Sequence, residues 1–241
     1  MRLETCIAVV TGAARGIGLA IASRLMAGGA RVILSDVNRA ALDAAVRSLA
    51  APHAKGIPAD VTSAGDLAAL AARAQDAFGP LNLWINNAGL ARHRRIEDYT
   101  EAEIDLMLAV NLKGTILGSQ TALRAMAPQR YGHIINIIST ASLRGIPTET
   151  VYCATKWGVR GFTQGLREEA APHGVRVTAL LPGGVDTAFW ADATRDRAVP
   201  VGKFLKAEVV ADAVAALVQM DDHAVPQELV LRAMEDRDFS S

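Results

Sequence analysis

A glycine-rich turn between two apolar runs constrains this chain more than any other stretch of its sequence. The turn, Thr11-Gly12-Ala13-Ala14-Arg15-Gly16-Ile17-Gly18, follows the apolar run 5–10 and opens a predicted helix that ends near Gly28-Gly29. Such glycines permit a tight turn and let backbone N–H groups approach a pyrophosphate, whose charge a helix N-terminus favours. A second predicted strand, 31–35, ends at Asp36, about 20 residues on, where a carboxylate can accept hydrogen bonds from a ribose diol. The order strand, turn, helix, strand therefore predicts a dinucleotide-binding unit.

Strand and helix patterns continue to alternate along the rest of the chain. Helices are predicted at 39–50, 64–78, 101–127, 148–171 and 207–219, and strands at 54–58, 81–85, 133–138 and 175–181. This alternation is typical of an open parallel sheet with helices on both faces. We therefore expect a single Rossmann-type, doubly wound α/β domain over residues 1–241, with about seven strands.

The composition narrows the class of protein further. Lys and Arg together number 25 and balance 25 Asp and Glu, so net charge gives no argument for nucleic acid or an anionic membrane as partner. No apolar run reaches the roughly 18 residues of a transmembrane helix, and the N-terminus has no signal-peptide pattern. The two cysteines, Cys6 and Cys153, are expected to be reduced thiols in a cytoplasmic protein. The five histidines show no metal-ligand spacing, so no metal site is predicted.

A tyrosine and a lysine in the predicted helix 148–171 are candidates for acid–base chemistry. Tyr152 and Lys156 are four positions apart and therefore lie on the same helical face. A free tyrosine has a pKa of about 10. A neighbouring cation is expected to lower that pKa, which would let the phenol exchange a proton with an alcohol or carbonyl near neutral pH. The predicted strand 133–138 would deliver the hydroxyl of Ser139 to the same edge of the sheet.

Several spacings resemble those of one enzyme family. The turn has the form G-x-x-x-G-x-G after Thr11, which is similar to the short-chain dehydrogenase/reductase family and differs from the commoner G-x-G-x-x-G. The resemblance continues almost end to end through Asn86-Asn87-Ala88-Gly89, Ser139 and the stretch Tyr152-Cys153-Ala154-Thr155-Lys156. It implies reversible hydride transfer between a nicotinamide cofactor and a secondary alcohol or its carbonyl.

The resemblance also implies residue roles. Tyr152 would be the acid/base, and Lys156 would depress its pKa and bind the nicotinamide ribose. Ser139 would donate to the substrate oxygen, and Asn111 would hold a water that connects Lys156 to solvent. The residues implied on the cofactor side are Gly12, Arg15, Gly16, Ile17, Gly18, Asp36, Asp60, Val61, Asn87, Ala88, Gly89, Tyr152, Lys156, Pro182, Gly183, Val185 and Thr187. Of these, Asp60 and Val61 would meet the adenine ring, and Thr187 would contact the nicotinamide carboxamide.

The sequence carries opposing indications about which nicotinamide is used. Asp36 would repel a 2′-phosphate and favours NAD. Arg15 lies just before the second glycine, where a basic residue often accompanies NADP in this family. Because the acid is the nearer group to the ribose, NAD is the preferred cofactor, and NADP is the alternative.

The substrate is less constrained than the cofactor. Arg92, Arg94 and Arg144 are candidate contacts for an anionic group, although a solvated loop is the plainer interpretation of the first two. Segment 188–206 has the composition of a short substrate lid. The C-terminal stretch 222–232 is similar to a branch of the family that oxidises small 3-hydroxy acids, whose members tend to use NADP. An NADPH-dependent 3-oxoacyl (acyl carrier protein) reductase is the runner-up activity.

Three glycines in helix 148–171 bear on assembly. Gly158, Gly161 and Gly165 would each weaken the helix, so close approach by another helix is expected. In the family this helix packs against its symmetry mate, which predicts a homodimer or homotetramer. Two other classes stay open: a catalytically silent dinucleotide sensor and a subunit whose purpose is assembly. The presence of all four catalytic positions argues against the first.

Overall fold

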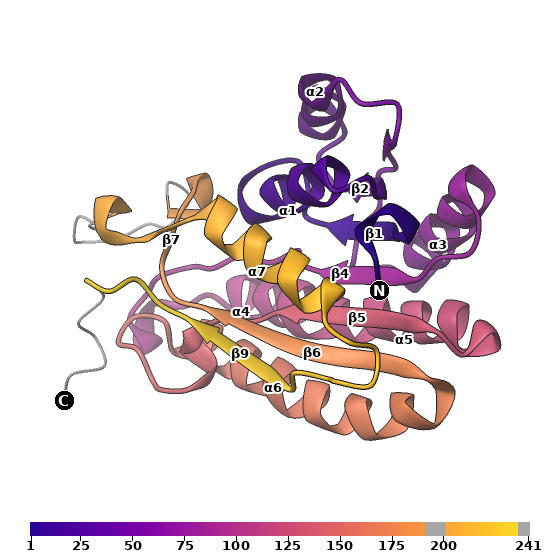
Figure 1. The fold of residues 1–241 in the computed structure, drawn as a ribbon. Coiled ribbons are helices and arrows are strands. Elements are labelled where there is room, and N and C mark those ends of the chain that lie inside the picture. Colours follow the sequence, from indigo (N-terminus) through magenta and orange to yellow (C-terminus); the bar gives the residue numbers. More distant parts are fainter. Residues whose placement is uncertain (191–200, 236–241) are drawn as a thin grey trace.

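A computed structural model describes residues 1–190 and 201–235 of the chain (Figure 1). Seven parallel strands form one sheet in the order β3-β2-β1-β4-β5-β6-β9. The strands are β1 Ile7–Thr11, β2 Arg31–Ser35, β3 Ala54–Gly56, β4 Leu83–Asn86, β5 Gly132–Ile137, β6 Val175–Pro182 and β9 Glu228–Leu231. The chain winds outward from β1 to β3, then returns to β4 on the other side of β1. The predicted doubly wound α/β fold is confirmed, with its switch point between β1 and β4.

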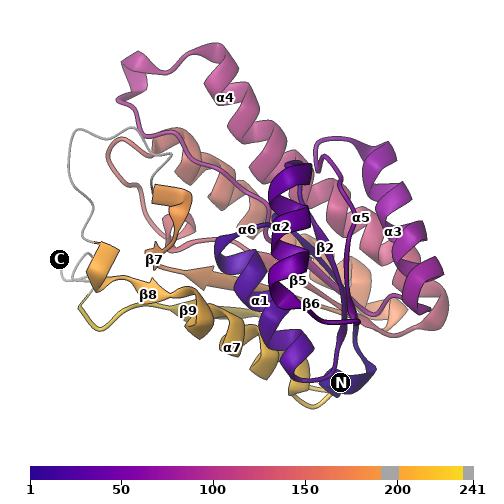
Figure 2. The same ribbon diagram turned by 90° about the horizontal axis from the view of Figure 1, so that it is seen from above.

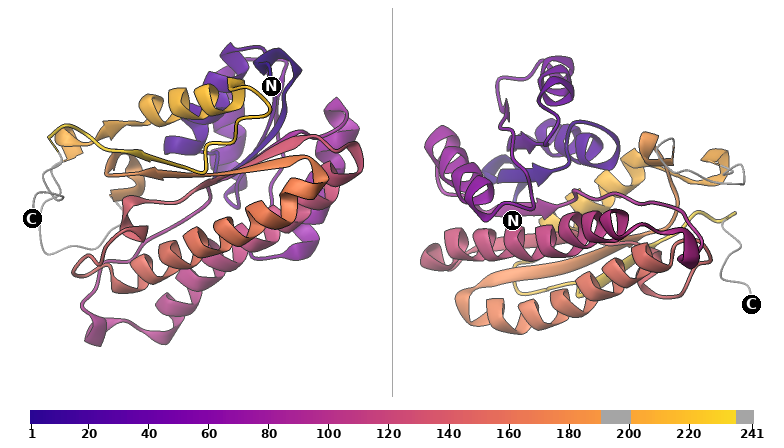
Figure 3. Two further views of the ribbon diagram at one scale, coloured as in Figure 1. Left: turned by 60° about the horizontal axis from the view of Figure 1, so that its bottom comes forward. Right: turned by 180° about the vertical axis from the view of Figure 1, so that it is seen from behind.

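Helices cover both faces of this sheet (Figure 3). On one face, α1 Gly16–Ala27, α2 Arg39–Leu49 and α7 Ala207–Gln219 share an apolar core with the sheet. On the other, α3 Ala64–Phe78, α5 Gly114–Met126 and α6 Thr150–Ala170 share a second core. Every residue of β1, β4, β5 and β6 is buried, because the sheet is covered on both sides.

Local capping explains where several helices begin. The side chain of Asn38 accepts from the backbone N–H of Ala41 at the start of α2, and that of Ser63 accepts from Asp66 at the start of α3. Helix α4, Glu101–Met107, opens with a capping box between Thr100 and Glu103. These signals are local, so the sequence alone locates these helix starts.

The predicted helix 101–127 is irregular at its centre. It consists of α4, a π-helical turn Leu108–Lys113, and α5. At the end of the π-turn, the N–H of Gly114 donates to the carbonyl of Ala109, five residues back. The cause lies outside the helix, because the side chain of Asn111 is bonded to Leu90 and to Thr155 of α6. The stretch predicted as one helix is therefore helical throughout, with an irregular turn around Asn111, where Asn and Gly are poor helix-interior residues.

Beyond β6 the chain forms a small second sheet. Strand β7, Val185–Asp186, pairs with β8, Leu205–Lys206, which lies next to the start of α7 (Figure 2). Of the predicted lid at 188–206, the structure places the 3-10 turns Ala188–Trp190 and Val201–Lys203, and residues 191–200 lie outside the described part. Among the helices that are described, none combines the length and apolar character needed to traverse a lipid bilayer.

Candidate active site

The glycine turn closes directly onto the end of β4. Gly12 has a φ of +62°, and a Cβ added there would lie 2.8 Å from Cα of Ala88. A Cβ on Gly18 would collide with the carbonyl oxygen of Gly12. Asn87 ties the two segments together, since its Nδ2 donates to the carbonyls of Thr11 at 2.9 Å and Gly12 at 3.1 Å. Only glycine fits these two positions: at Gly12 both the backbone angle and the space exclude a side chain, and at Gly18 the space does.

The predicted ribose-binding acid lies beside the same turn. One oxygen of Asp36 accepts from the backbone N–H of Ala14 at 3.3 Å, and the other accepts from that of Asn38 at 3.0 Å. Arg15 is exposed at the surface of the turn, and Ile17 packs against the core of the α1 face. The carboxylate of Asp36 is thus fixed at the mouth of the turn by two backbone donors.

The residues predicted to meet adenine lie across the switch point. Val61 packs against Gly114, where a Cβ would lie 2.9 Å from Val61 Cγ2, and it shares a small crevice with Thr11 and Ala88. Asp60 uses its carboxylate locally, accepting at 2.8 Å from both the N–H and the hydroxyl of Thr62. The structure therefore brings Val61 next to the ends of β1 and β4, and the side chain of Asp60 shapes the turn that carries it.

The turn after β6 reaches the glycine turn from the other side. A Cβ on Gly16 would lie 3.5 Å from the side chain of Thr187, and Gly183 is held by an N–H bond of 2.8 Å to Leu231 of β9. Pro182 is the buried last residue of β6, and Val185 is buried in β7. Segments 12–18, 87–89 and 182–187 thus meet at one edge of the sheet.

The catalytic candidates lie on the buried face of α6. Tyr152 is 9% exposed and Lys156 5%, and Lys156 Nζ lies 5.6 Å from the centre of the tyrosine ring. A Cβ on Gly89 would lie 3.7 Å from Lys156 Nζ and 3.3 Å from Asn111 Oδ1. Ser139, at the end of β5, forms a hydrogen bond with the side chain of Tyr152. The structure thus brings all four predicted catalytic residues together beside a predicted cofactor residue.

The protonation preferences of this site differ from the expectation that Lys156 lowers the pKa of Tyr152. Burial raises the pKa of Tyr152, the charge of Glu149 raises it further, and the hydrogen bond with Ser139 opposes both. Lys156 does not offset these effects here, because its ammonium lies over the ring and donates to the carbonyl of Ile137 at 3.3 Å. Burial also lowers the pKa of Lys156 to about 8. The predicted direction for Tyr152 was therefore wrong in this structure.

Asn111 is fully buried, and its side-chain amide forms hydrogen bonds within the protein. Its Oδ1 accepts from the backbone N–H of Leu90 at 2.9 Å, and its Nδ2 donates to the carbonyl of Leu90 at 2.8 Å and to Thr155 Oγ1 at 3.2 Å. The side chain therefore holds the chain after β4 against the catalytic helix. The predicted link to solvent through a water stays a prediction.

Four residues near Tyr152 were not identified from the sequence. His93 Nδ1 lies 3.3 Å from Glu149 Oε1, and both side chains are buried. His93 stacks on Trp190, and Phe189 packs against the ring of Tyr152. Phe189 and Trp190 are adjacent residues of the predicted lid segment 188–206, whereas His93 and Glu149 form no motif that could have placed them near Tyr152.

The three arginines predicted as candidate anion contacts have different surroundings in the structure. Arg94 forms an ion pair with Glu103 at 3.0 Å, and Arg92 donates to the carbonyl of Ala91 at 3.1 Å. Arg144 is half-buried, and its charge acts on Cys153, next to Tyr152. Of the three, Arg144 is the one whose charge acts on a residue of α6 next to Tyr152.

Comparison with known proteins agrees with this geometry. A family model described as short chain dehydrogenase matches residues 6–198. The chain belongs to the short-chain dehydrogenase/reductase family. An uncharacterized oxidoreductase of Staphylococcus aureus is 40% identical over 227 residues, which are 94% of this chain and 96% of the relative. The 2-(S)-hydroxypropyl-CoM dehydrogenase 3 of Xanthobacter autotrophicus is 38% identical over 231 residues, and the match covers 90% of this chain and 91% of the relative.

Solved structures of the short-chain dehydrogenase/reductase family agree in fold. A 3-ketoacyl-(acyl-carrier-protein) reductase from Brucella melitensis, complexed with NADH, matches with a TM-score of 0.89 at 28% identity over 96% of this chain and 98% of that one. An alcohol dehydrogenase from Thermococcus sibiricus, complexed with 5-hydroxy-NADP, matches with a TM-score of 0.85 at 30% identity over 94% and 96%. This chain is accordingly an oxidoreductase that exchanges a hydride between a nicotinamide cofactor and a secondary alcohol or its carbonyl.

Proposed function

We propose that Tyr152 is the acid/base of this hydride exchange and that NAD is the preferred cofactor. The observation that carries the proposal is the meeting of Tyr152, Ser139 and Lys156 beside Gly89, on the edge where the glycine turn lies. Parallel α/β sheets bind ligands at this edge, outside the carboxyl ends of the strands.

The residues of this edge fit a dinucleotide. Gly12 and Gly18 let the glycine turn pack tightly on itself and on the end of β4, and the backbone N–H groups at the start of α1 would suit a pyrophosphate. Asp36 would bind the adenosine ribose, and Val61 the adenine. Lys156 would bind the nicotinamide ribose. A nicotinamide bound here supplies the ring that takes or gives the hydride.

The proton that accompanies the hydride would be exchanged by residues of the chain itself. Tyr152 would give its proton to a carbonyl oxygen or take one from an alcohol, at an oxygen that Ser139 also contacts. Hydrogen-bond donors aimed at that oxygen stabilise the charge that develops on it in the transition state. The aromatic rings of Phe189 and Trp190 lie close by and would help to exclude water.

The preference for NAD rests on Asp36. Its carboxylate is fixed beside the turn by Ala14 and Asn38, and a negative charge in this place opposes a 2′-phosphate. Arg39, the nearest downstream cation, is bonded to Asp43 at 3.0 Å. These contacts support NAD over NADP.

Turnover with each cofactor tests this preference. Wild-type protein is assayed on a panel of secondary alcohols, polyols, hydroxy acids and their carbonyl forms with both cofactors, beside Asp36→Ala. We expect faster turnover with NAD, and a loss of affinity for NAD of about 10- to 100-fold in the variant, because a charge-assisted bond is removed. Faster turnover of the wild type with NADP would contradict the preference.

The same panel of substrates tests a second activity, the reduction of a 3-oxoacyl thioester. Reduction of a 3-oxoacyl thioester is favoured by the likeness to the Brucella melitensis reductase, whose TM-score is 0.89. A small 3-hydroxy acid is the other alternative, and an anion contact at Arg144 would suit it. An acyl-thioester and a hydroxy acid in the panel separate these from simple alcohols.

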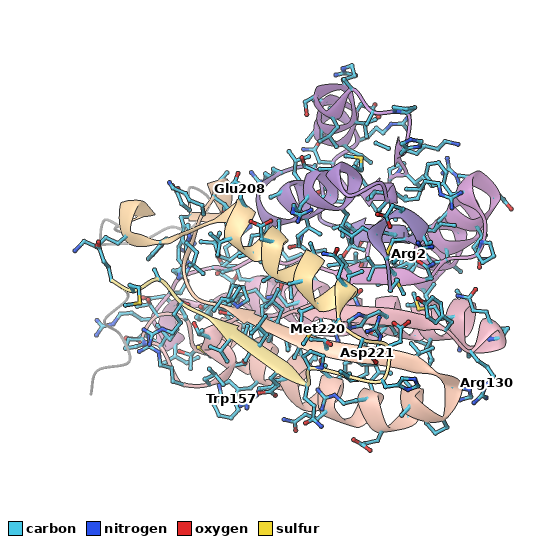
Figure 4. All side chains as sticks on the ribbon, in the orientation of Figure 1. Arg2, Arg130, Trp157, Glu208, Met220 and Asp221 are labelled. Atoms are coloured by element: carbon cyan, nitrogen blue, oxygen red, sulfur yellow. The ribbon has the colours of Figure 1, made fainter. Side chains whose placement is uncertain are left out.

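We further propose that a second copy of the chain packs on the outward face of α6. A Cβ on Gly161 or Gly165 would meet nothing within 4 Å, so neither glycine is needed for packing within the chain. Trp157 is 49% exposed and projects from α6 away from the sheet (Figure 4). Burying this face against its symmetry mate would account for both features and give a homodimer or homotetramer.

A further inference from the structure

A network of polar side chains crosses the apolar core beneath the candidate active site. Its members come from two central strands and two helices, and each is 5% exposed or less: Trp84, Asn86, Ser119, Asn136 and Thr163. Asn86 and Asn136 belong to β4 and β5, which are covered on both faces and would normally be continuous apolar runs. An amide in such a place costs free energy unless its hydrogen bonds are made, so the two asparagines need a physical reason.

The hydrogen bonds of this network run in one direction, from β4 to α6. Trp84 Nε1 donates to Asn86 Oδ1 at 2.8 Å, and Asn86 Nδ2 donates to Asn136 Oδ1 at 2.8 Å. Asn136 Nδ2 in turn donates to Thr163 Oγ1 at 2.9 Å. The hydroxyl of Thr163 donates to the carbonyl of Val159 at 2.6 Å. Because the surroundings are apolar and each of these groups has its partner, the network holds its members rigidly.

The network joins the strand that leads to Ser139 to the helix that carries Lys156. Asn136 lies on β5, three residues before Ser139. Thr163 lies on α6, seven residues after Lys156, which is about two helical turns along the same face. Lys156 Nζ also donates to the carbonyl of Ile137 at 3.3 Å. Side-chain hydrogen bonds therefore attach α6 to β5 both at Lys156 and at Thr163.

Apolar contacts between α6 and the rest of the protein define the position of the helix along its axis less sharply. Leu166 and Ala170 pack in the core that α6 shares with α3 and α5. Burial of such side chains is non-directional, so a small slide of the helix changes the buried area little. A hydrogen bond has a narrow range of length and angle, and breaking a buried one leaves an unpaired amide. The bond between Asn136 and Thr163 thus selects one register of α6 on β5.

We propose that Asn136 and Thr163 are positioning residues, which set the register of α6 so that Tyr152 meets the substrate oxygen that Ser139 contacts. Both hydroxyls must lie within hydrogen-bond reach of that one oxygen, and a misplacement of about 1 Å can lower turnover by about 10²-fold. Asn136 and Thr163 act through the helix and touch neither substrate nor cofactor. This inference rests on the proposed role of Tyr152 as acid/base.

Thr163→Val tests the inference, because it removes the hydroxyl at nearly constant volume. Steady-state turnover of a substrate found by the panel is measured at saturating substrate and cofactor. We expect kcat to fall by roughly 10- to 100-fold, because Tyr152 and Ser139 are no longer held in register. Thr163→Ser keeps a hydroxyl that can accept from Asn136, so its kcat should remain near the wild-type value. Circular dichroism confirms that each variant is folded.

Thr178→Val is the matched control. Thr178 is also fully buried, and its hydroxyl lies 2.9 Å from Nε2 of His133 and donates to the carbonyl of Pro226 at 2.8 Å. The same hydroxyl is lost, but its partners lie outside α6, so kcat should remain near the wild-type value. An unchanged kcat in Thr163→Val, an equal fall in Thr178→Val, or a Thr163→Ser protein as slow as Thr163→Val would overturn the inference.

A double variant keeps the test decisive if Thr163→Val does not fold. Asn136→Leu combined with Thr163→Val replaces both partners by apolar side chains, so neither is left unpaired. Asn86 keeps its bond to Ser119 at 2.9 Å. The double variant should have a lowered kcat, and a wild-type kcat would overturn the inference. Failure of the acid/base role would appear separately, as wild-type turnover in Tyr152→Phe, whereas failure of the present inference alone leaves that variant inactive.

Discussion

Burial shifts the pKa of Tyr152 and the pKa of Lys156, both on α6, in opposite directions, and in both cases it favours the neutral form. It raises the pKa of Tyr152 and lowers that of Lys156 to about 8. A lysine that is 5% exposed destabilises the fold while it carries its charge, because the ammonium has lost most of its hydration. The site therefore holds Lys156 at a cost in stability, which is expected of a residue kept for chemistry.

Replacing Lys156 by methionine should stabilise the protein and abolish turnover. Methionine fills a similar volume without a charge, so the free energy of unfolding at pH 7 should rise by up to about 3 kcal/mol. The pKa of Lys156 is about 8 in the fold against 10.5 as a model group, so the unfolded chain binds more protons between these values. Wild-type stability should therefore rise with pH across that window, and the advantage of Lys156→Met should shrink.

Urea denaturation at pH 7, 9 and 10.5 measures the free energy of unfolding of both proteins and how their difference changes with pH. Lys206→Met is the matched control, because Lys206 is exposed and paired with Asp186. Two results would contradict this account: a Lys156→Met protein that is less stable than the wild type at pH 7, or a stability difference that does not change with pH. Either would show that the buried charge of Lys156 does not lower the stability of the fold.

At the scale of elements, α6 presents three different surfaces. One face carries Tyr152 and Lys156 to the site, and another packs on the sheet through Leu166 and Ala170. The outward face exposes Trp157 and has open space at Gly161. The proposed assembly would cover this outward face and leave the catalytic face unchanged.

Gly161→Leu tests the role of the outward face. A leucine there meets nothing within the chain, so the fold of one copy should persist, but the side chain would hold a second helix away. We expect the assembly to dissociate or weaken by at least about tenfold, measured by sedimentation equilibrium. Ala69→Leu, which also places a leucine at an exposed position of a helix, here α3, is the control. An assembly that is unchanged by Gly161→Leu would contradict packing on α6.

Most elements could be predicted because their signals are local. The helix expected at 64–78 matches α3, that at 207–219 matches α7, and the strand at 31–35 matches β2, residue for residue. The π-helical turn Leu108–Lys113 could not be predicted, because it depends on bonds from Asn111 to residues far away in the chain. The residue pattern of one helix does not indicate which distant residues its side chains will bond.

The same contrast holds in the site. The glycine turn, Ser139, Tyr152 and Lys156 have fixed spacings, and the fold brings them to one edge of the sheet. The direction of the pKa shift of Tyr152 could not be predicted, because it depends first on the burial of the phenol and then on the charge of Glu149. Side-chain directions and loop positions are set by long-range packing, which a sequence motif does not specify.

At the scale of the whole molecule, the winding of the sheet creates the site. The strands are parallel, so the turns after β1, β4, β5 and β6 open at one edge, and the strand order reverses between β1 and β4. The glycine turn, Gly89, Ser139 and Thr187 reach this edge from four places in the sequence. Helix α6 brings the proposed acid/base, Tyr152, to the same edge, beside the residues proposed to bind the cofactor.

Tyr152→Phe tests the central claim most directly. Cofactor affinity, followed by the fluorescence of NADH, and steady-state turnover of a substrate found by the panel are measured on the same preparations of wild type and variant. Because only the phenolic hydroxyl is removed, we expect NADH to bind within about threefold of the wild type and turnover to fall by about 10²- to 10⁴-fold. A variant that binds NADH and turns over substrate at the wild-type rate would contradict the account.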